Sequence, residues 1–192
     1  MCGIIGYFGE NSSLFKEKIS LKDISHRGPD FSDFISDKNF YLGHTRLSIL
    51  DLSNNGNQPM FSSDRNCVII FNGEIYNHQE LRKNLETKYN FISSSDTETL
   101  LYGLIEEGVD FIKKLNGIFS FSFFNTITEK FIVARDHFGV KPLYYHVNKS
   151  GLCFSSELKA LVNFLPKTTI NQAALKNYLN FLWSPGEATP LN

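Results

Sequence analysis

The chain of 192 residues is 42% hydrophobic and 20% charged, which suits a packed globular domain and excludes wholesale disorder. Its 19 Lys and Arg and 20 Asp and Glu give a net charge of -1, so it lacks the basic excess of a nucleic-acid-binding surface. No apolar run approaches the ~20 residues of a membrane helix, and no signal peptide follows Met1. Three cysteines cannot all pair with one another, so we expect free thiols in a reducing, cytoplasmic setting.

Apolar and polar residues alternate in several short segments, which predicts strands with one buried face. Strands are expected at 3–8, 34–35, 40–42, 67–71, 118–125, 130–135, 143–147 and 152–155, most of them in hairpins. Phenylalanine accounts for 18 residues, and the alternation of Phe119, Phe121 and Phe123 favours an aromatic sandwich core over a ligand-stacking surface.

Capping residues mark where helices are expected to begin. Asn77 precedes an apolar pattern over 78–89, and Ser95 with Glu98 forms a capping box before a helix that runs to about 107. Shorter helical segments are expected at 111–115 and 157–164. Because strands come in hairpins and helices come in groups, the pattern is α+β and not an alternation of single strands and helices.

The C-terminal end has a different pattern. Residues 166–169 are interpreted as a linker, and Asn171 caps an expected helix over 172–183 that Ser184-Pro185-Gly186 would end. One apolar stripe runs along that helix through Leu175, Tyr178, Leu179 and Leu182. We therefore expect one domain over 1–165 and, over 166–192, a linker and the first helix of a second domain, whose exposed stripe could join two copies as a homodimer.

Cys2 is the first candidate for chemistry, because removal of Met1 would give it a free α-amine beside its thiol. An α-amine titrates near ~8 and a thiol near ~8.5, so the pair suits nucleophile-and-base chemistry near neutral pH. A cysteine at this position is also compatible with no function. Cys67 and Cys153 lie in apolar strands and are interpreted as core residues.

Asn72, Gly73 and Glu74 follow the expected strand 67–71 directly and leave two interpretations open. A side-chain amide followed by an unhindered backbone N–H suits an oxyanion hole, in which one donor contributes about 3 to 4 kcal/mol to the transition state. Asn-Gly is also the strongest short-range signal for a hairpin turn.

Arg46, Glu74 and Asp96 suit a substrate that carries both an α-carboxylate and an α-ammonium. Arg46 offers bidentate pairing to a carboxylate, and Asp96 or Glu74 could take the ammonium. Each has a structural alternative: a salt bridge for Arg46, and the first turn of a helix for Asp96.

The histidines show no metal-ligand spacing among themselves or with the cysteines, so we expect no metal site. They are His26, His44, His78, His137 and His146. No glycine-rich loop of the kind that binds phosphate or a dinucleotide occurs in the sequence.

Eight motifs cover nearly the whole chain in order. They are 1–6 (MCGIIG), 26–30 (HRGPD), 43–51 (GHTRLSILD), 58–60 (QPM), 71–77 (FNGEIYN), 95–98 (SDTE), 135–144 (RDHFGVKPLY) and 155–161 (SSELKAL). Together they resemble the class II, N-terminal-nucleophile glutamine amidotransferases. The finer resemblance is to the glutaminase domain of glutamine-hydrolysing asparagine synthetases.

The resemblance implies the N-terminal-nucleophile hydrolase fold, a four-layer αββα sandwich of two antiparallel sheets faced by helices. It implies that Cys2 attacks the side-chain amide of glutamine while its α-amine moves the proton, and that Asn72 and Gly73 hold the oxyanion. Arg46 would bind the α-carboxylate and Asp96, with Glu74, the α-ammonium. The glutamine pocket would be lined by Leu47, Ser48, Ile49 and Leu50.

The resemblance also implies that ammonia passes to a C-terminal synthetase-like domain of the same parent chain, by default for asparagine synthesis. The ATP loop of that family, of the type Ser-Gly-Gly-x-Asp-Ser, does not occur in this sequence. ATP and Mg are therefore expected only in that other domain, and no cofactor in this one. Alternatives are a parent that amidates a sugar carboxylate in surface polysaccharide synthesis, a non-catalytic glutamine-binding or interaction module, and a hydrolase of another amide.

Overall fold

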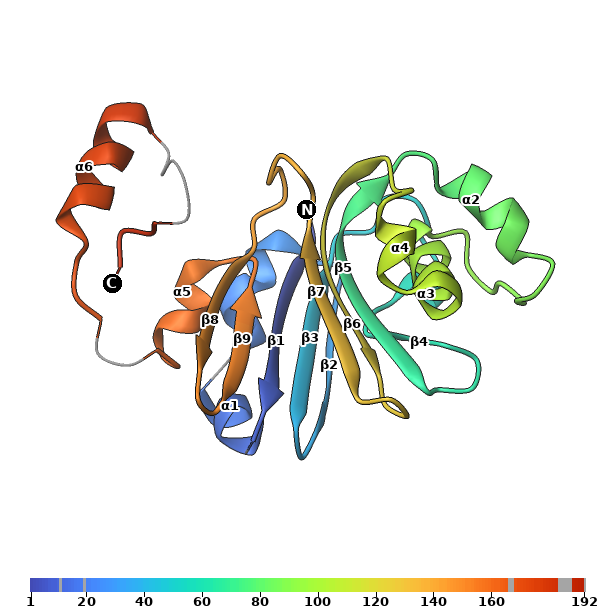
Figure 1. Cartoon of the computed structure of the whole chain (residues 1–192), viewed down its shortest axis with the longest axis horizontal. Helices are drawn as coiled ribbons and strands as arrows, with labels where there is room; N and C mark the ends of the chain where they lie inside the picture. The colour runs from blue at the N-terminus through green and yellow to red at the C-terminus, as the bar shows by residue number, and fades with distance from the viewer. Residues whose placement is uncertain (11, 19, 166–167, 183–187, 192) are drawn as a thin grey trace.

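A computed structural model describes residues 1–10, 12–18, 20–165, 168–182 and 188–191. Its strands form two antiparallel sheets that pack face to face, and helices cover both outer faces (Figure 1). The predicted α+β class and the four-layer αββα sandwich are therefore confirmed.

The first sheet has five strands in the order β2-β3-β1-β9-β8. Their bounds are β1 Gly3–Gly9, β2 Phe31–Asp37, β3 Phe40–Arg46, β8 Tyr144–Asn148 and β9 Gly151–Ser155. The pleat of β1 decides which side chain faces which layer. Ile4 and Phe8 lie in the core between the sheets, whereas Ile5 and Tyr7 pack against the helices outside.

The second sheet has four strands in the order β4-β5-β6-β7. Their bounds are β4 Met60–Phe61, β5 Cys67–Ile75, β6 Gly117–Asn125 and β7 Lys130–Arg135. The alternating Phe119, Phe121 and Phe123 of β6 are buried under the helices on the outer face of this sheet. The predicted aromatic core is confirmed.

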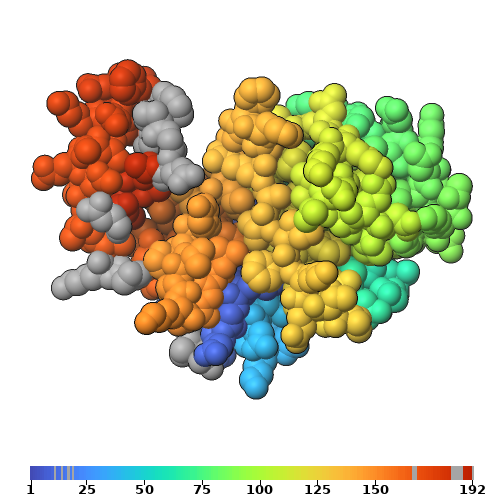
Figure 2. All heavy atoms as spheres, viewed as in Figure 1, coloured from blue at the N-terminus to red at the C-terminus, as the bar shows by residue number. Residues whose placement is uncertain are grey.

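The helices form the two outer layers. On the first sheet lie α1 Ser12–Lys18, the 3-10 helix η1 Leu21–Arg27 and α5 Leu158–Val162. On the second lie α2 His78–Leu85, α3 Asp96–Glu107 and α4 Val109–Ile112. The 3-10 turn η2 Asn54–Gly56 lies in the loop after β3. In Figure 2, the orange β8 and β9 and the gold β6 and β7 cover much of the blue and cyan strands behind them.

Several predicted boundaries are wrong, and long-range hydrogen bonds explain two of them. Asn77 does not cap α2, because its carboxamide accepts from the N–H of Asn116 at 2.9 Å and donates to the carbonyl of Lys114 at 2.9 Å. Strand β5 continues past Phe71 to Ile75, because it pairs with β6 along its whole length. Helix α2 ends at 85 and not at 89, α5 is shorter than 157–164, and α4 begins and ends earlier than the predicted 111–115. The elements α1, η1 and β4 were not predicted.

Helix α6, Gln172–Phe181, lies to one side of the sandwich, at the left in Figure 1. The predicted cap is confirmed, since Asn171 Oδ1 accepts from the N–H of Ala174 at 3.0 Å. Leu179 and Leu182 of the predicted stripe are exposed. Residues 166–167 of the expected linker lie outside the described residues. So do residues 183–186, where the helix was expected to end. The division into domains at 165 and the homodimer stay predictions.

No helix of the described residues is long and apolar enough to cross a bilayer.

The buried carboxylate of Asp136 holds the loop after β7 against β6. It accepts hydrogen bonds from the backbone N–H groups of Phe119, Phe138, Val140 and Lys141 at 2.9–3.2 Å. Burial favours the neutral acid, but these donors outweigh it and hold the pKa of Asp136 below its ordinary value.

We expect Asp136→Ala to lower the free energy of unfolding by about 3 kcal/mol, because it leaves buried N–H groups unpaired. Since the pKa is depressed in the folded state, this stabilisation is present at neutral pH and is lost as the pH falls below about 4. Urea unfolding at several pH values measures it. Asp33→Ala, an exposed control in β2, should stay within about 0.5 kcal/mol of the parent.

Candidate active site

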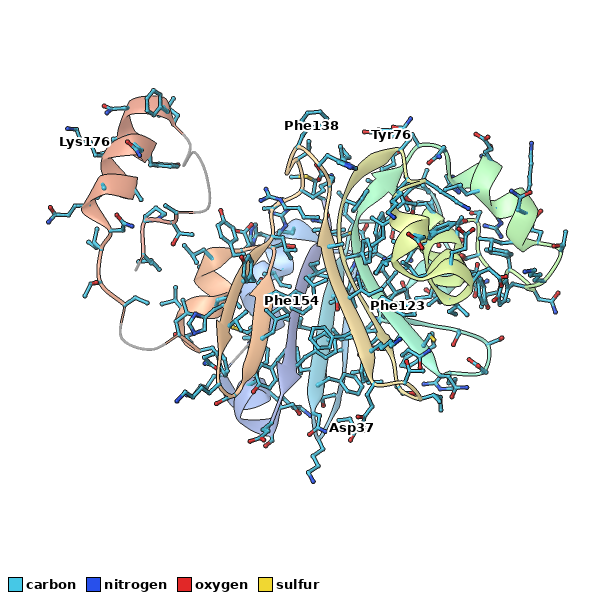
Figure 3. All side chains as sticks on the ribbon, in the orientation of Figure 1. Asp37, Tyr76, Phe123, Phe138, Phe154 and Lys176 are labelled. Atoms are coloured by element: carbon cyan, nitrogen blue, oxygen red, sulfur yellow. The ribbon has the colours of Figure 1, made fainter. Side chains whose placement is uncertain are left out.

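A pocket of about 80 Å³ opens where the start of β1 meets the end of β3 and the middle of β5. Figure 3 shows the labelled side chains of Phe138 and Tyr76 at the same end of the sandwich, and both are exposed. Nine of the ten predicted site residues line this pocket: Cys2, Arg46, Leu47, Ile49, Leu50, Asn72, Gly73, Glu74 and Asp96. Ser48 does not, and its N–H donates to Asp30 Oδ2 at 2.7 Å.

The thiol of Cys2 lies against the backbone of Leu47. Its Sγ accepts from the Leu47 N–H at 3.4 Å and lies 3.6 Å from the Leu47 carbonyl oxygen. The Cys2 carbonyl in turn accepts from Arg27 Nε at 3.0 Å. Burial raises the pKa of the Cys2 thiol, although the Leu47 N–H and the charge of Arg46 oppose this. The thiol therefore needs a base before it can attack, and with Met1 attached its own nitrogen is an amide.

Asn72 and Gly73 lie inside strand β5 and pair with Ser120 and Phe119 of β6. The interpretation of this Asn-Gly pair as a hairpin turn is therefore wrong. Asn72 is 1% exposed, and neither its Nδ2 nor its Oδ1 has a hydrogen-bond partner among the described residues. A Cβ at Gly73 would lie 2.4 Å from the carbonyl oxygen of Ile118, so only glycine fits there. A buried amide with free donors beside the thiol is what an oxyanion hole requires.

Arg46 is buried and makes its hydrogen bonds to neutral groups. It donates to the carbonyl of Ser53 at 2.8 Å, to Asn57 Oδ1 at 2.7 Å and to the carbonyl of Asp51. A Cβ at Gly56 would lie 2.3 Å from the guanidinium, so glycine makes room for it. No carboxylate of the described residues forms an ion pair with Arg46, although Asp51, Glu74 and Asp96 line the same pocket, so the guanidinium has no direct partner of opposite charge. The predicted salt-bridge alternative is not seen.

Asp96 is 5% exposed at the first turn of α3 and carries the opposite charge. Its Oδ2 accepts from the N–H of Ile75 at 2.9 Å, and no cation of the described residues pairs with it. Burial raises the pKa of Asp96 to about 6, and the charge of Glu74 adds to this. Ser95 caps the helix as predicted, since its Oγ accepts from the Glu98 N–H at 3.4 Å. The reciprocal half of the predicted capping box is wrong, because the Glu98 carboxylate accepts from the N–H groups of Ile92 and Ser93, and the Ser95 N–H donates to Ser93 Oγ.

Buried and unpaired charges are costly, so a ligand with the complementary charges gains more here than on the surface. Arg46 and Asp96 together are complementary to a free amino acid, whose carboxylate and ammonium lie on one carbon. The pocket thus joins a thiol, an unpartnered amide and two opposite charges.

Sequence reasoning missed eight pocket residues: Met1, Asp51, Gly56, Gln58, Phe71, Ser95, Thr97 and Lys141. The buried side chain of Gln58 bridges β5 and α3, because its Oε1 accepts from the Phe71 N–H at 2.6 Å and its Nε2 donates to Thr97 Oγ1 at 3.2 Å. The motifs at 58–60 and 135–144 contained Gln58 and Lys141, but nothing in them indicated where the side chains would lie.

A larger cavity of about 560 Å³ lies at the opposite end of the sandwich, among the hairpin turns. Its apolar floor includes Phe8, Phe40, Phe124 and Phe131. It contains no cysteine and no pair of buried opposite charges. The smaller pocket is therefore the candidate active site, because it contains the thiol and the opposite charges that the reaction needs, although the other cavity is larger. Among the described residues, no three His, Cys, Asp or Glu side chains gather in a way that could hold a metal ion.

Comparison with known proteins agrees with this geometry. A family model described as "Glutamine amidotransferase domain" matches residues 1–192. The chain belongs to the glutamine amidotransferase domain family. Relatives of this amidotransferase domain include asparagine synthetase [glutamine-hydrolyzing] 1 of Bacillus subtilis, 38% identical over 98% of this chain and 31% of that protein. Asparagine synthetase B of Escherichia coli is 39% identical over 84% of this chain and 30% of that protein. The chain thus spans about a third of the length of these curated relatives.

Solved structures show the same fold at lower sequence identity. The glutamine phosphoribosylpyrophosphate amidotransferase of Bacillus subtilis matches with a TM-score of 0.70 and 22% identity, over 83% of this chain and 43% of that one. A structure described as the allosteric regulatory enzyme of purine biosynthesis matches with a TM-score of 0.69 and 20% identity, over 84% and 43%. At this identity the likeness concerns the fold alone.

Proposed function

We propose that this chain hydrolyses L-glutamine to glutamate and ammonia through a thioester on Cys2. The observation that carries the proposal is the pocket that joins the Cys2 thiol to Arg46 and Asp96, two opposite charges that form no ion pair among the described residues. Arg46 binds the α-carboxylate of glutamine, and Asp96, with Glu74, binds the α-ammonium. Leu47, Ile49 and Leu50 line the pocket around the substrate's carbon chain.

The chemistry begins once Met1 is removed and the nitrogen of Cys2 is a free amine. That amine takes the thiol proton, and the thiolate forms a bond to the amide carbon of glutamine. The side-chain N–H of Asn72 and the backbone N–H of Gly73 stabilise the tetrahedral oxyanion. The amine then gives its proton to the leaving nitrogen, the C–N bond breaks, and ammonia departs. Water attacks the thioester, which releases glutamate and restores the thiol.

We infer that the ammonia serves an amidation in a longer parent protein. The relatives reported above are named glutamine-hydrolysing asparagine synthetases, which supports asparagine synthesis as the parent reaction and gives no support to a sugar carboxylate acceptor. ATP and Mg are expected in the synthetase-like part of that parent, and no cofactor in this chain. A cytoplasmic location belongs to the same proposal.

The proposal is tested with protein prepared to begin at Cys2, verified by intact mass. We expect glutamate release from glutamine and none from N-acetylglutamine, because acylation removes the ammonium that Asp96 binds. The same protein with Met1 retained should be inactive, since Cys2 then lacks its amine. Binding of glutamine without turnover would support a non-catalytic module instead, and turnover of N-acetylglutamine would support a hydrolase of other amides.

The buried carboxylate of Asp96 predicts an acid limit for activity. We expect kcat/KM for glutamine to fall by an additional factor of about ten for each pH unit below about 6, beyond the fall caused by protonation of the Cys2 amine, because protonated Asp96 cannot pair with the ammonium. A pH profile of kcat/KM measures this limb. A limb centred near 4 would contradict the role of the buried Asp96.

Asp96→Asn should separate function from stability. Its side-chain oxygen can still accept from Ile75, but it cannot bind a cation, so KM rises steeply. The pKa of Asp96 is raised from its ordinary 3.8 to about 6, so ionisation destabilises the folded state as the pH rises through this range. At pH 7 the variant should therefore gain up to about 3 kcal/mol in unfolding free energy. Asp110→Asn, at an exposed carboxylate, should leave KM unchanged.

A further inference from the structure

A group of buried polar side chains lies between the two sheets behind the pocket. We call it the polar layer, and it consists of His44 on β3, Asn72 on β5, and Ser120 and Ser122 on β6. Each of the four is at most 1% exposed. Of the nine buried side-chain atoms without a partner among the described residues, five belong to this layer: His44 Nδ1, both amide atoms of Asn72, and the two serine hydroxyls.

The strand pleat places these side chains on the same face. On β5, Val68 and Ile70 lie in the core between the sheets, and Asn72 continues that alternation. On β6, Phe124 packs in the same core while Phe121 lies under the helices, so the two serines point between the sheets. Ser120 stands directly opposite Asn72 in the β5–β6 register.

His44 joins the layer to the backbone of the site. Its Nε2 lies 3.1 Å from the carbonyl oxygen of Phe71, the residue before Asn72. A carbonyl only accepts, so Nε2 carries the proton and Nδ1 of the neutral ring is an acceptor. Burial lowers the pKa of His44 to about 3, so the ring stays neutral in the working range. His44 Nδ1 therefore needs a donor from within the layer.

An aromatic layer bounds the polar layer on the side away from the pocket. The ring of Phe154 lies over Gly6, where a Cβ would be 2.2 Å from the ring. Phe8 and Phe124 continue this aromatic layer, with ring centroids 5.3 Å apart. The ring centroids of Phe154 and Phe8 are 6.3 Å apart, and Figure 3 labels Phe154 on β9, below the end of the sandwich where the N-terminus lies. Asn72 belongs both to the polar layer and to the wall of the pocket.

We propose that the polar layer is a water-binding site that orients the carboxamide of Asn72. Buried water typically makes about three hydrogen bonds to polar groups that have no other partner, and this layer offers five such atoms. A water that donates to His44 Nδ1 and to Asn72 Oδ1 and accepts from a serine hydroxyl satisfies all three. It turns Asn72 Oδ1 toward the layer, so Nδ2 faces Cys2. Ser120 and Ser122 are then positioning residues, and this catalytic consequence rests on the proposed glutaminase function.

A high-resolution crystal structure of the chain beginning at Cys2 tests the site without any turnover. We expect an ordered water within hydrogen-bonding distance of His44 Nδ1, of Asn72 Oδ1 and of at least one serine hydroxyl, and a water that does not reach Asn72 would overturn the orienting role. A dry layer, in which the hydroxyls bond one another or the backbone, overturns the proposal. This readout separates a failure of the water site from a failure of the proposed glutaminase activity.

Kinetics of Ser120→Ala and Ser122→Ala test the positioning role. At metal sites, loss of a residue that orients a ligand lowers affinity or activity about 10- to 100-fold, and we expect an effect of similar size for a residue that orients an oxyanion donor. We expect kcat to fall about tenfold or more in at least one variant with KM unchanged, because the layer acts on the oxyanion and not on substrate binding. Ser62→Ala is the control: its hydroxyl bonds Asp64 and Cys67 far along β5, so it should lower stability and leave kcat unchanged. Unchanged kcat in both layer variants overturns the positioning role.

Discussion

Cys2→Ala is expected to abolish glutamine hydrolysis while leaving the fold intact. The nucleophile is the one group whose loss stops thioester formation outright, so kcat should fall at least about 10³-fold. The side chain is only partly buried at the edge of the sandwich, so the unfolding free energy should change by about 1 kcal/mol or less. Glutamate release and urea unfolding of the same preparation measure both quantities.

The other two thiols are the matched controls. Cys67 and Cys153 are buried in strands, and burial raises the pKa of each to about 11, so neither supplies a thiolate at neutral pH. Cys67→Ala and Cys153→Ala should each cost stability and leave kcat unchanged. Full activity of Cys2→Ala, or loss of activity with Cys67→Ala, would assign the nucleophile elsewhere and end the thioester mechanism at Cys2.

The layers of the fold could be predicted because the alternation of apolar and polar residues along a strand shows which of its two faces is buried. The phenylalanines of β6 alternate at the period of a pleated strand, and the structure buries them on one face. Arg46 and Asp96 could be proposed as partners of a free amino acid because their charges are visible in sequence. Their common pocket and the absence of compensating charges depend on chain packing that no local pattern contains.

The errors arose where long-range pairing outweighed a local preference. Asn72-Gly73 prefers a turn in isolation, but the register with Ser120 and Phe119 keeps both residues extended in β5. Asn77 resembles a helix cap, but it bonds the backbone at 114–116 across the fold. The motif at 58–60 contained Gln58 but did not reveal its role, since the bonds of its side chain to Phe71 and Thr97 depend on elements distant in sequence.

Asn72→Ala is expected to lose activity and keep its stability. An ordinary buried asparagine would show the reverse: its truncation would lower stability and leave activity unchanged. Removal of one oxyanion donor typically lowers kcat about 10²- to 10³-fold, because the interaction is made in the transition state, and KM should stay near the parent value. Neither amide atom of Asn72 has a partner in the part of the chain that the structure describes, so truncation breaks no hydrogen bond there. The unfolding free energy should therefore change by less than about 1 kcal/mol.

Asn77→Ala supplies the contrast, because the Asn77 carboxamide makes two backbone hydrogen bonds and lies outside the pocket. It should lower the unfolding free energy by about 1 to 2 kcal/mol and leave kcat unchanged. If Asn72→Ala instead loses stability and raises KM as kcat falls, the amide acts by shaping the pocket. The oxyanion role would then rest on the Gly73 N–H alone, and the placement of an unpartnered amide beside Cys2 would need another explanation.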